Sequence, residues 1–268
     1  MNNTLLLVDN SYNAFYRINA TLMWYKRAHP EEKYDKDYDW STNKIYTDKL
    51  KKMYLNSLSK IIKKHKIELN NIYFCRDCKR KDIWRMDLYP EYKKNRDGIS
   101  NNFGNIFKYI YSEVLPELQQ KGIKVISSER AEADDVIAII KNLTRSQEKD
   151  HEIVIITSDH DYLQLIDKNT YIYNLKNKLL NEKSYGSAEK DLMVKILTGD
   201  KSDNIPSVWK KCGEKTALKY LANEKLLQEK LKESEILEKF KLNQRLIDFK
   251  YIPTEIIESV QQKFNKYV

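Results

Sequence analysis

The strongest constraint on the fold of this chain of 268 residues is a set of short apolar segments, most of which are followed by acidic residues. Their length is typical of buried strands, and they lie at residues 5–9, 71–77, 123–127, 152–157 and 170–175. Segments with helical spacing separate them, at residues 41–66, 102–122 and 132–143. This alternation predicts an α/β fold with a mostly parallel central sheet flanked by helices.

The pattern changes near residue 187, after which we predict helices only. Helical spacing recurs at residues 187–199, 214–223, 224–232 and 253–264. We therefore expect an α/β domain over residues 1–186 and a helical subdomain over residues 187–268. Within the first domain, Ser41 or Thr42 would cap a helix, and Gly122 would end one as its C′ residue.

Composition narrows the class of protein less than the pattern does. The formal net charge of +9 suits a polyanionic partner, although a lysine-rich bias of an AT-rich genome would give the same value. Cys75 and Cys78 have C-x-x-C spacing, but no second Cys or His pair completes a zinc site. We favour reduced, structural thiols over a redox motif. Without a signal peptide or a membrane-length apolar run, a cytosolic protein is expected.

Acidic residues collect where the predicted strands end. They are Asp9, Asp77, Glu132, Asp134, Asp135, Asp159 and Asp161, to which the segment "GDKSDN" adds Asp200 and Asp203. Because the carboxyl ends of parallel strands meet at one edge, these side chains would converge there. On a helix, Asp200 and Asp203 would share a face. Glu132 and Asp134 lie about 200° apart on an ideal helix, so both reach one site only if Glu132 precedes the helix.

A cluster of this density needs cations, since neighbouring carboxylates resist joint ionisation. Oxygen donors without His or Cys favour Mg²⁺, with Mn²⁺ as a substitute, over zinc. Two such ions would support phosphoryl transfer, in which one activates water and the other stabilises the leaving oxygen. Any single acid could instead be a helix cap or a turn residue, but the repeated placement at strand ends favours a shared site.

Residues 76–98 interleave cations with aromatic side chains, a pattern that suits a nucleic-acid strand because cations neutralise phosphates and rings stack on bases. The cations are Arg80, Lys81, Arg85, Lys93, Lys94 and Arg96, and the aromatic residues are Trp84, Tyr89 and Tyr92. A solvated charged loop is the alternative interpretation.

Five motifs in this order resemble the 5′ nuclease (flap endonuclease) superfamily, which has a PIN-like fold. They are "FCRDC…YPEYKKNR", "EADD", "TSDHDYLQL", "GDKSDNIP" and "GEKTA". The likeness covers nearly the whole chain and is strongest to phage 5′→3′ exonucleases of the ribonuclease H type. It implies a helical arch around residues 79–110.

The resemblance also implies roles for individual residues. Asp9, Asp77, Glu132, Asp134 and Asp159 would hold one metal ion, and Asp135, Asp161, Asp200 and Asp203 the second. Lys93 and Arg96 would contact the scissile phosphate, Arg85 would support the strand, and Tyr92 would stack on an unpaired 5′ end. Arg80, Lys81 and Lys94 would contribute to nucleic-acid binding.

The sequence departs from the family at its helix–hairpin–helix turn. The family's glycine-rich turn is replaced by "SVWKKCGEKTA", in which only Gly213 remains. Glycines allow close backbone approach to a ligand, and most of them are missing here. The sequence therefore does not decide whether this turn binds K⁺, as such turns often do. Lys210, Lys211 and Lys215 could replace the duplex contacts by charge.

The sequence therefore predicts a Mg²⁺-dependent 5′→3′ exonuclease and flap endonuclease that acts on DNA and RNA/DNA with 5′ ends or flaps and removes replication primers. We expect a monomer with no membrane association, located in the host cytoplasm if a phage encodes it. The sequence does not decide whether it contacts a single-strand-binding protein or a sliding clamp. The alternatives are a PIN-type ribonuclease and a non-catalytic DNA-binding scaffold.

Overall fold

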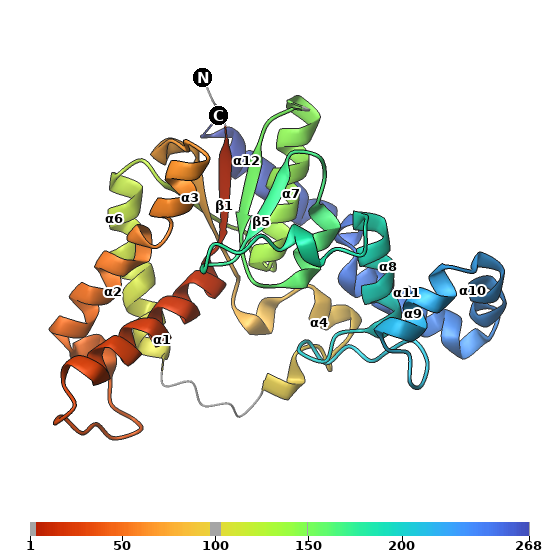
Figure 1. Cartoon of the computed structure of the whole chain (residues 1–268), viewed down its shortest axis with the longest axis horizontal. Helices are drawn as coiled ribbons and strands as arrows, with labels where there is room; N and C mark the ends of the chain where they lie inside the picture. Colours follow the sequence, from red (N-terminus) through yellow and green to blue (C-terminus); the bar gives the residue numbers. More distant parts are fainter. Residues whose placement is uncertain (1–3, 97–102, 149, 268) are drawn as a thin grey trace.

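A single parallel sheet organises the molecule (Figure 1). The computed structural model describes residues 4–96, 103–148 and 150–267. Within these residues, five parallel strands are ordered β3-β2-β1-β4-β5. They are β1 (Leu5–Asp9), β2 (Ile72–Arg76), β3 (Lys124–Ser127), β4 (Ile153–Ile156) and β5 (Thr170–Tyr173). The predicted α/β fold with a parallel sheet is confirmed.

Both faces of the sheet are covered, which explains why the central strands β1 and β4 are continuous apolar runs rather than alternating patterns. Leu5 and Leu7 pack in the core of one face, whereas Leu6 and Val8 pack in that of the other. Two helices cover the first face, α7 (Ala133–Gln147) and α12 (Thr254–Asn265). The second face is covered by α1 (Asn10–Ala28), α2 (Lys44–Asn56), α3 (Ser59–Lys64), α5 (Gly104–Tyr109) and α6 (Leu115–Gln120).

The helices of the second face differ from the sequence prediction in detail. The segment 41–66 is interrupted between α2 and α3, and Asn43, rather than Ser41 or Thr42, caps α2 by accepting from the Tyr46 amide at 2.9 Å. Residues 110–114 between α5 and α6 form a π-helical turn, η5. Gly122 follows α6 with φ of 90°, as expected of a C′ glycine, while residue 102 lies outside the described residues.

The helical region follows the sheet and returns to it. Its helices are α8 (Ala188–Thr198), α9 (Glu214–Leu221), α10 (Glu224–Leu231) and α11 (Ser234–Ile247). In Figure 1 they extend to the right of the sheet, and α12 runs back behind it. Ile256, Val260 and Phe264 of α12 belong to the same core as β1 and α7. Among the described residues no helix has the length and apolar character needed to span a bilayer.

Candidate active site

Asp9 lies at the centre of the carboxyl edge of the sheet. It is the last residue of β1, and the strand order places it between Asp77, which follows β2, and Asp159, which follows β4. Its Oδ1 accepts from the Tyr12 amide at 3.0 Å, and its Oδ2 accepts from the Tyr162 hydroxyl at 3.2 Å. Burial, with the neighbouring charges of Asp77 and Asp159, raises the pKa of Asp9 to about 7. A cation at this edge would therefore be stabilising.

Glu132 satisfies the geometric condition set by the sequence. α7 begins at Ala133, so Glu132 is its N-cap and lies outside the helix proper. The side chains of Glu132 and Asp135 form a reciprocal capping box. Asp77 Oδ1 accepts from the Ala133 amide at 2.8 Å, which joins the end of β2 to the start of α7. Glu132, Asp134 and Asp135 each offer a carboxylate oxygen within 4.8 Å of the others.

Arg85 occupies the interior beside this group. Its Nη1 lies 3.0 Å from Glu132 Oε2, and its Nη2 lies 2.7 Å from Asp135 Oδ1. Asp135 Oδ2 accepts further bonds from Arg85 Nη1 and from the Trp84 indole, both at 2.9 Å. Arg85 and Asp135 are 2% and 0% exposed. The structure thus brings Asp135 together with Glu132 and Asp134, and its assignment to the second metal stays a prediction.

Lys93 approaches the same carboxylates from residues 76–98, the basic segment. Its Nζ contacts Glu132 Oε1 and lies 3.6 Å from Asp203 Oδ2. Burial alone would raise the pKa of Glu132, but Lys93 and Arg85 outweigh it and hold this pKa below its usual value. Asp134 is different: burial, with Asp135 and Glu132 nearby, raises its pKa well above normal despite Arg85. Asp134 is therefore a carboxylate that still lacks sufficient positive charge.

The segment "GDKSDN" forms a tight loop, not the helix considered from its spacing. The backbone groups of Asp200 and Ile205 bond to each other at 2.9 and 2.7 Å. Gly199 permits this closure because its φ is 68° and a Cβ there would lie 2.4 Å from the carbonyl oxygens of Ile205 and Pro206. The Asp200 carboxylate accepts from the Ser202 amide at 2.6 Å, which fixes its direction.

Asp161, Asp200 and Asp203 form the second acidic group, with one oxygen of each within 4.8 Å of the others. Lys195 of α8 contacts Asp161 Oδ1 and lies 2.6 Å from Asp200 Oδ2. Burial and the charge of Asp159 raise the pKa of Asp161 to about 8, although Lys195 opposes this shift. For Asp200, burial is outweighed by Lys195 and the Ser202 bonds, so its pKa is lowered. The Lys195 ammonium thus supplies part of the positive charge that offsets these carboxylates.

The predicted substrate-contacting residues lie around these groups. Arg96 Nη2 is 2.6 Å from Asp203 Oδ1, and this guanidinium is exposed on its outer side. Tyr92 is only 3% exposed, and its hydroxyl donates to Glu132 at 2.9 Å. Stacking of Tyr92 on a base would require its segment to move, and this role stays a prediction. Lys94 is exposed and pairs with Glu91, while Arg80 donates to the Lys93 carbonyl oxygen.

The predicted arch and hairpin turn are described in part. The basic segment consists of the short turns η3 (Arg80–Asp82), α4 (Arg85–Leu88) and η4 (Lys94–Arg96), and residues 97–102 of the predicted arch lie outside the described residues. Lys210 and Lys211 are exposed at the turn that precedes α9, Lys215 is exposed in the first turn of α9, and Lys81 is exposed in η3. Gly213 is the N-cap of α9.

Sequence reasoning missed several partners of the acids. Lys195 lies in the predicted helix at residues 187–199, just before the motif "GDKSDNIP", but nothing in its spacing indicates that it bridges two carboxylates. Ser11 donates to Asp77 and Tyr162 to Asp9.

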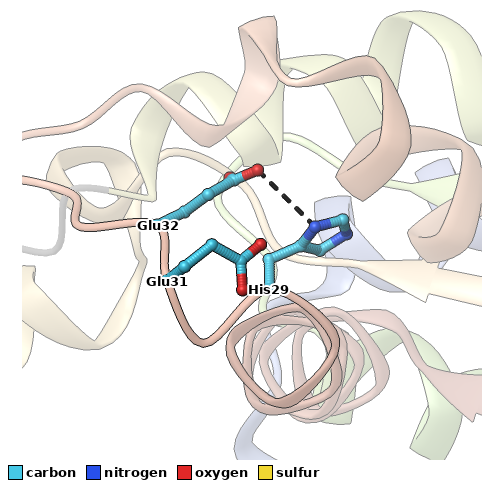
Figure 2. Close-up of side chains that lie close together, drawn as sticks. All are labelled: His29, Glu31 and Glu32. Carbon is cyan, nitrogen blue, oxygen red and sulfur yellow. Dashed lines mark ion pairs between the residues drawn. The ribbon is translucent and has the colours of Figure 1, made fainter.

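A third group, His29, Glu31 and Glu32, follows α1 (Figure 2), with His29 Nδ1 3.5 Å from Glu32 Oε1. Tyr25 and Tyr34 donate to Glu32, so this group anchors its own loop.

The two acidic groups at the sheet edge fit divalent cations. Their donors are carboxylate oxygens, the ligand type that hard cations such as Mg²⁺ and Mn²⁺ prefer. The raised pKa values of Asp9, Asp134 and Asp161 show that the protein's own cations leave negative charge uncompensated. The fold and site therefore define an α/β protein with an acidic centre at the carboxyl edge of a parallel sheet.

Comparison with known proteins then places the chain. Residues 4–190 match the model of the 5′-3′ exonuclease N-terminal resolvase-like domain, and residues 186–268 match that of the T4 RNase H C-terminal domain. The chain belongs to the 5′-3′ exonuclease family. It is 31% identical to ribonuclease H of Enterobacteria phage T4 over 84% of this chain and 79% of that protein.

Other relatives match more locally or in fold alone. A 5′-3′ exonuclease of Mycoplasmopsis pulmonis is 37% identical over 66% of this chain and 58% of that protein. The solved structure of the T5 D15 protein co-crystallised with metal ions has a TM-score of 0.69, with 15% identity and 99% of each chain covered. This last likeness shows that the two chains share a fold.

Proposed function

We propose that the chain is a structure-specific 5′→3′ exonuclease and flap endonuclease that hydrolyses phosphodiesters in DNA and RNA/DNA duplexes with 5′ ends or flaps. One observation carries the proposal: two acidic groups face each other across Lys93, which contacts Glu132 and lies 3.6 Å from Asp203. Membership in the 5′-3′ exonuclease family and the likeness to T4 ribonuclease H support it. Removal of replication primers would follow from the same activity.

Two Mg²⁺ ions, when bound, would activate the attacking water and stabilise the leaving oxygen. Asp9, Asp77, Glu132, Asp134 and Asp159 would hold one ion, and Asp135, Asp161, Asp200 and Asp203 the other. Asp135 would also support Glu132 through the capping box. Mn²⁺ could replace Mg²⁺.

The chain's own cations would position the strand. Arg96 presents an exposed guanidinium next to Asp203, and Lys93 would turn from Glu132 towards a phosphate once other cations neutralise the acids. In the reaction, an oxygen of water bonds to phosphorus and the bond from phosphorus to the 3′ oxygen breaks. The products would carry a 3′ hydroxyl and a 5′ phosphate.

A duplex with a labelled 5′ flap tests the function. Incubation with Mg²⁺ should release the flap as short oligonucleotides, whereas EDTA should prevent cleavage. Preferential cleavage of free single-stranded RNA would favour a PIN-type ribonuclease. Binding of the flapped duplex in Ca²⁺ without cleavage in Mg²⁺ or Mn²⁺ would favour a DNA-binding scaffold.

A further inference from the structure

A groove of about 1030 Å³ opens beside the acidic centre. It begins at Asp77, crosses the carboxyl ends of β2 and β3, and reaches Lys263 of α12. Small-molecule pockets are typically about 300–1,000 Å³, so this groove is as large as the upper end of that range. Because Asp77 lines it, the groove is continuous with the active centre.

Cations from separate parts of the chain line this groove. They are Arg76, Lys79, Lys81, Arg130 and Lys263. Four acids line it as well, Asp77, Asp82, Asp87 and Glu129, and Arg130 pairs with Asp87. Lys79 and Lys81 are exposed on one side, and Lys263 approaches from α12, where it donates to the Ser127 carbonyl oxygen at 2.6 Å. The spread of these charges suits an extended polyanion better than a single small anion.

The lining of the groove includes a guanidinium stacked on an aromatic ring. The Arg76 guanidinium lies 4.0 Å from the centroid of the Tyr111 ring, and both residues line the groove. Tyr111 belongs to the π-helical turn η5 (Ile110–Val114), and such turns occur often at functional sites. Aromatic rings and guanidinium planes are the surfaces on which unpaired bases stack.

The groove and helix α8 lie on opposite sides of β1, whose last residue is Asp9. α8 packs against η6, which follows β4, whereas the groove lies over β2 and β3 on the other side of β1. A strand whose duplex part contacts the helical region would pass the acids and then enter the groove.

We propose that this groove binds the unpaired segment of the cleaved strand on the 5′ side of the scissile phosphate. Lys79, Lys81 and Lys263 would contact its phosphates, and the Arg76–Tyr111 pair would stack on a base. The proposal rests on the proposed function, since it assumes that a strand is cleaved at the acidic centre. Its ligand is single-stranded DNA or RNA attached to a duplex.

Binding of two matched duplexes in Ca²⁺ tests the proposal, with fluorescence anisotropy as the readout. One duplex has a flush 5′ end and the other a five-nucleotide 5′ flap. The wild-type protein should bind the flapped duplex more tightly. In the double variant Lys79→Glu, Lys263→Glu this gain should fall about tenfold, and the slope of log affinity against log salt should fall by about 1–2. Affinity for the flush duplex should stay unchanged.

Two further variants separate the groove from general charge and folding effects. The double variant Lys60→Glu, Lys63→Glu makes the same charge change at two exposed lysines of α3 outside the groove and should keep the full gain. Tyr111→Leu removes the ring without changing the charge, so it should lose the part of the affinity gain that comes from base stacking. Thermal unfolding of each variant checks the fold.

The groove proposal is overturned if the wild type shows no gain from the flap, or if the Lys79→Glu, Lys263→Glu variant keeps it. Cleavage in Mg²⁺ is measured in parallel on the wild-type protein. Failure of that cleavage would remove the proposed function, whereas cleavage with an unchanged flap gain would remove the groove proposal alone.

Discussion

The Arg85 guanidinium and the Asp135 carboxylate form a two-bond ion pair inside the protein, with Nη1–Oδ2 at 2.9 Å and Nη2–Oδ1 at 2.7 Å. Arg85 Nε also donates to the Leu246 carbonyl oxygen at 2.8 Å. One side chain therefore ties the basic segment to the start of α7 and to the end of α11. These bonds fix the position of the acidic centre relative to the helical region.

Replacing Arg85 with Met should destabilise the protein strongly. It would leave the buried Asp135 and Glu132 carboxylates without a charge partner, a loss of about 3–5 kcal/mol in the free energy of unfolding. Arg85→Lys should recover only part of this, because an ammonium cannot make two parallel bonds. Urea unfolding measures both variants against Arg130→Met, whose surface ion pair should matter little. A loss below about 1 kcal/mol for Arg85→Met would contradict this account.

Asp159→Asn should abolish cleavage and spare folding and DNA binding. Asp159 caps η6 through a 2.9 Å bond from the Asp161 amide, and an asparagine oxygen can keep that bond. The lost charge should lower the cleavage rate in Mg²⁺ more than about a hundredfold. Flap cleavage in Mg²⁺ and duplex binding in Ca²⁺ give the two readouts. Full activity of the variant would rule out Asp159 as a metal ligand.

The acidic centre was predictable because its acids follow short apolar strands of one parallel sheet. β1, β2 and β4 end at or just before Asp9, Asp77 and Asp159, and the order of the strands places these ends side by side. For Glu132, helix geometry gave only a condition: it must precede the helix to share a site with Asp134. The predicted helix 132–143 included Glu132, and the structure starts α7 one residue later.

Other features could not be predicted because they depend on tertiary packing. Helix α1 was missed since Asn10, Asn13 and Arg17 occupy its buried side, which removes the apolar stripe that indicates a helix. The contacts of Lys195 join residues far apart in sequence, so no local pattern predicts them.

Lys195→Met should increase the affinity of the second acidic group for a divalent cation. The Lys195 ammonium contacts Asp161 and lies 2.6 Å from Asp200, so an entering ion must overcome its charge. Burial lowers the pKa of Lys195, but Asp161 and Asp200 outweigh this and keep the side chain charged. Removing one such charge should strengthen Ca²⁺ binding about tenfold, measured by titration calorimetry. Equal or weaker binding would show that Lys195 does not compete with the ion.

A carboxylate far from the centre should set part of the acid stability. Asp167 accepts from Arg145 Nε at 2.9 Å and from Thr170 at 2.7 Å. Burial alone would raise its pKa, but these bonds outweigh it and lower the pKa to about 2. Its contribution is therefore present above the unfolded value of about 4 and is lost as the pH falls from about 4 towards 2.

Asp167→Asn measures this contribution. Relative to the wild type, the variant should lose about 1–2 kcal/mol of unfolding free energy at pH 7, and this difference should shrink below pH 4. Urea unfolding at pH 7 and pH 3 gives the two values. A difference that does not change with pH would contradict the ion-pair explanation.

Gly199→Ala should disrupt the loop that carries Asp200 and Asp203. A Cβ at this position would lie 2.4 Å from two backbone oxygens, and φ of 68° is unfavourable for alanine. We expect a loss of about 2–4 kcal/mol in unfolding free energy and weaker divalent-cation binding. Gly104→Ala is the matched control, because its Cβ would meet no atom within 4 Å in a helix start. If both variants are equally stable and bind Ca²⁺ equally well, the close approach at Gly199 does not shape the second acidic group.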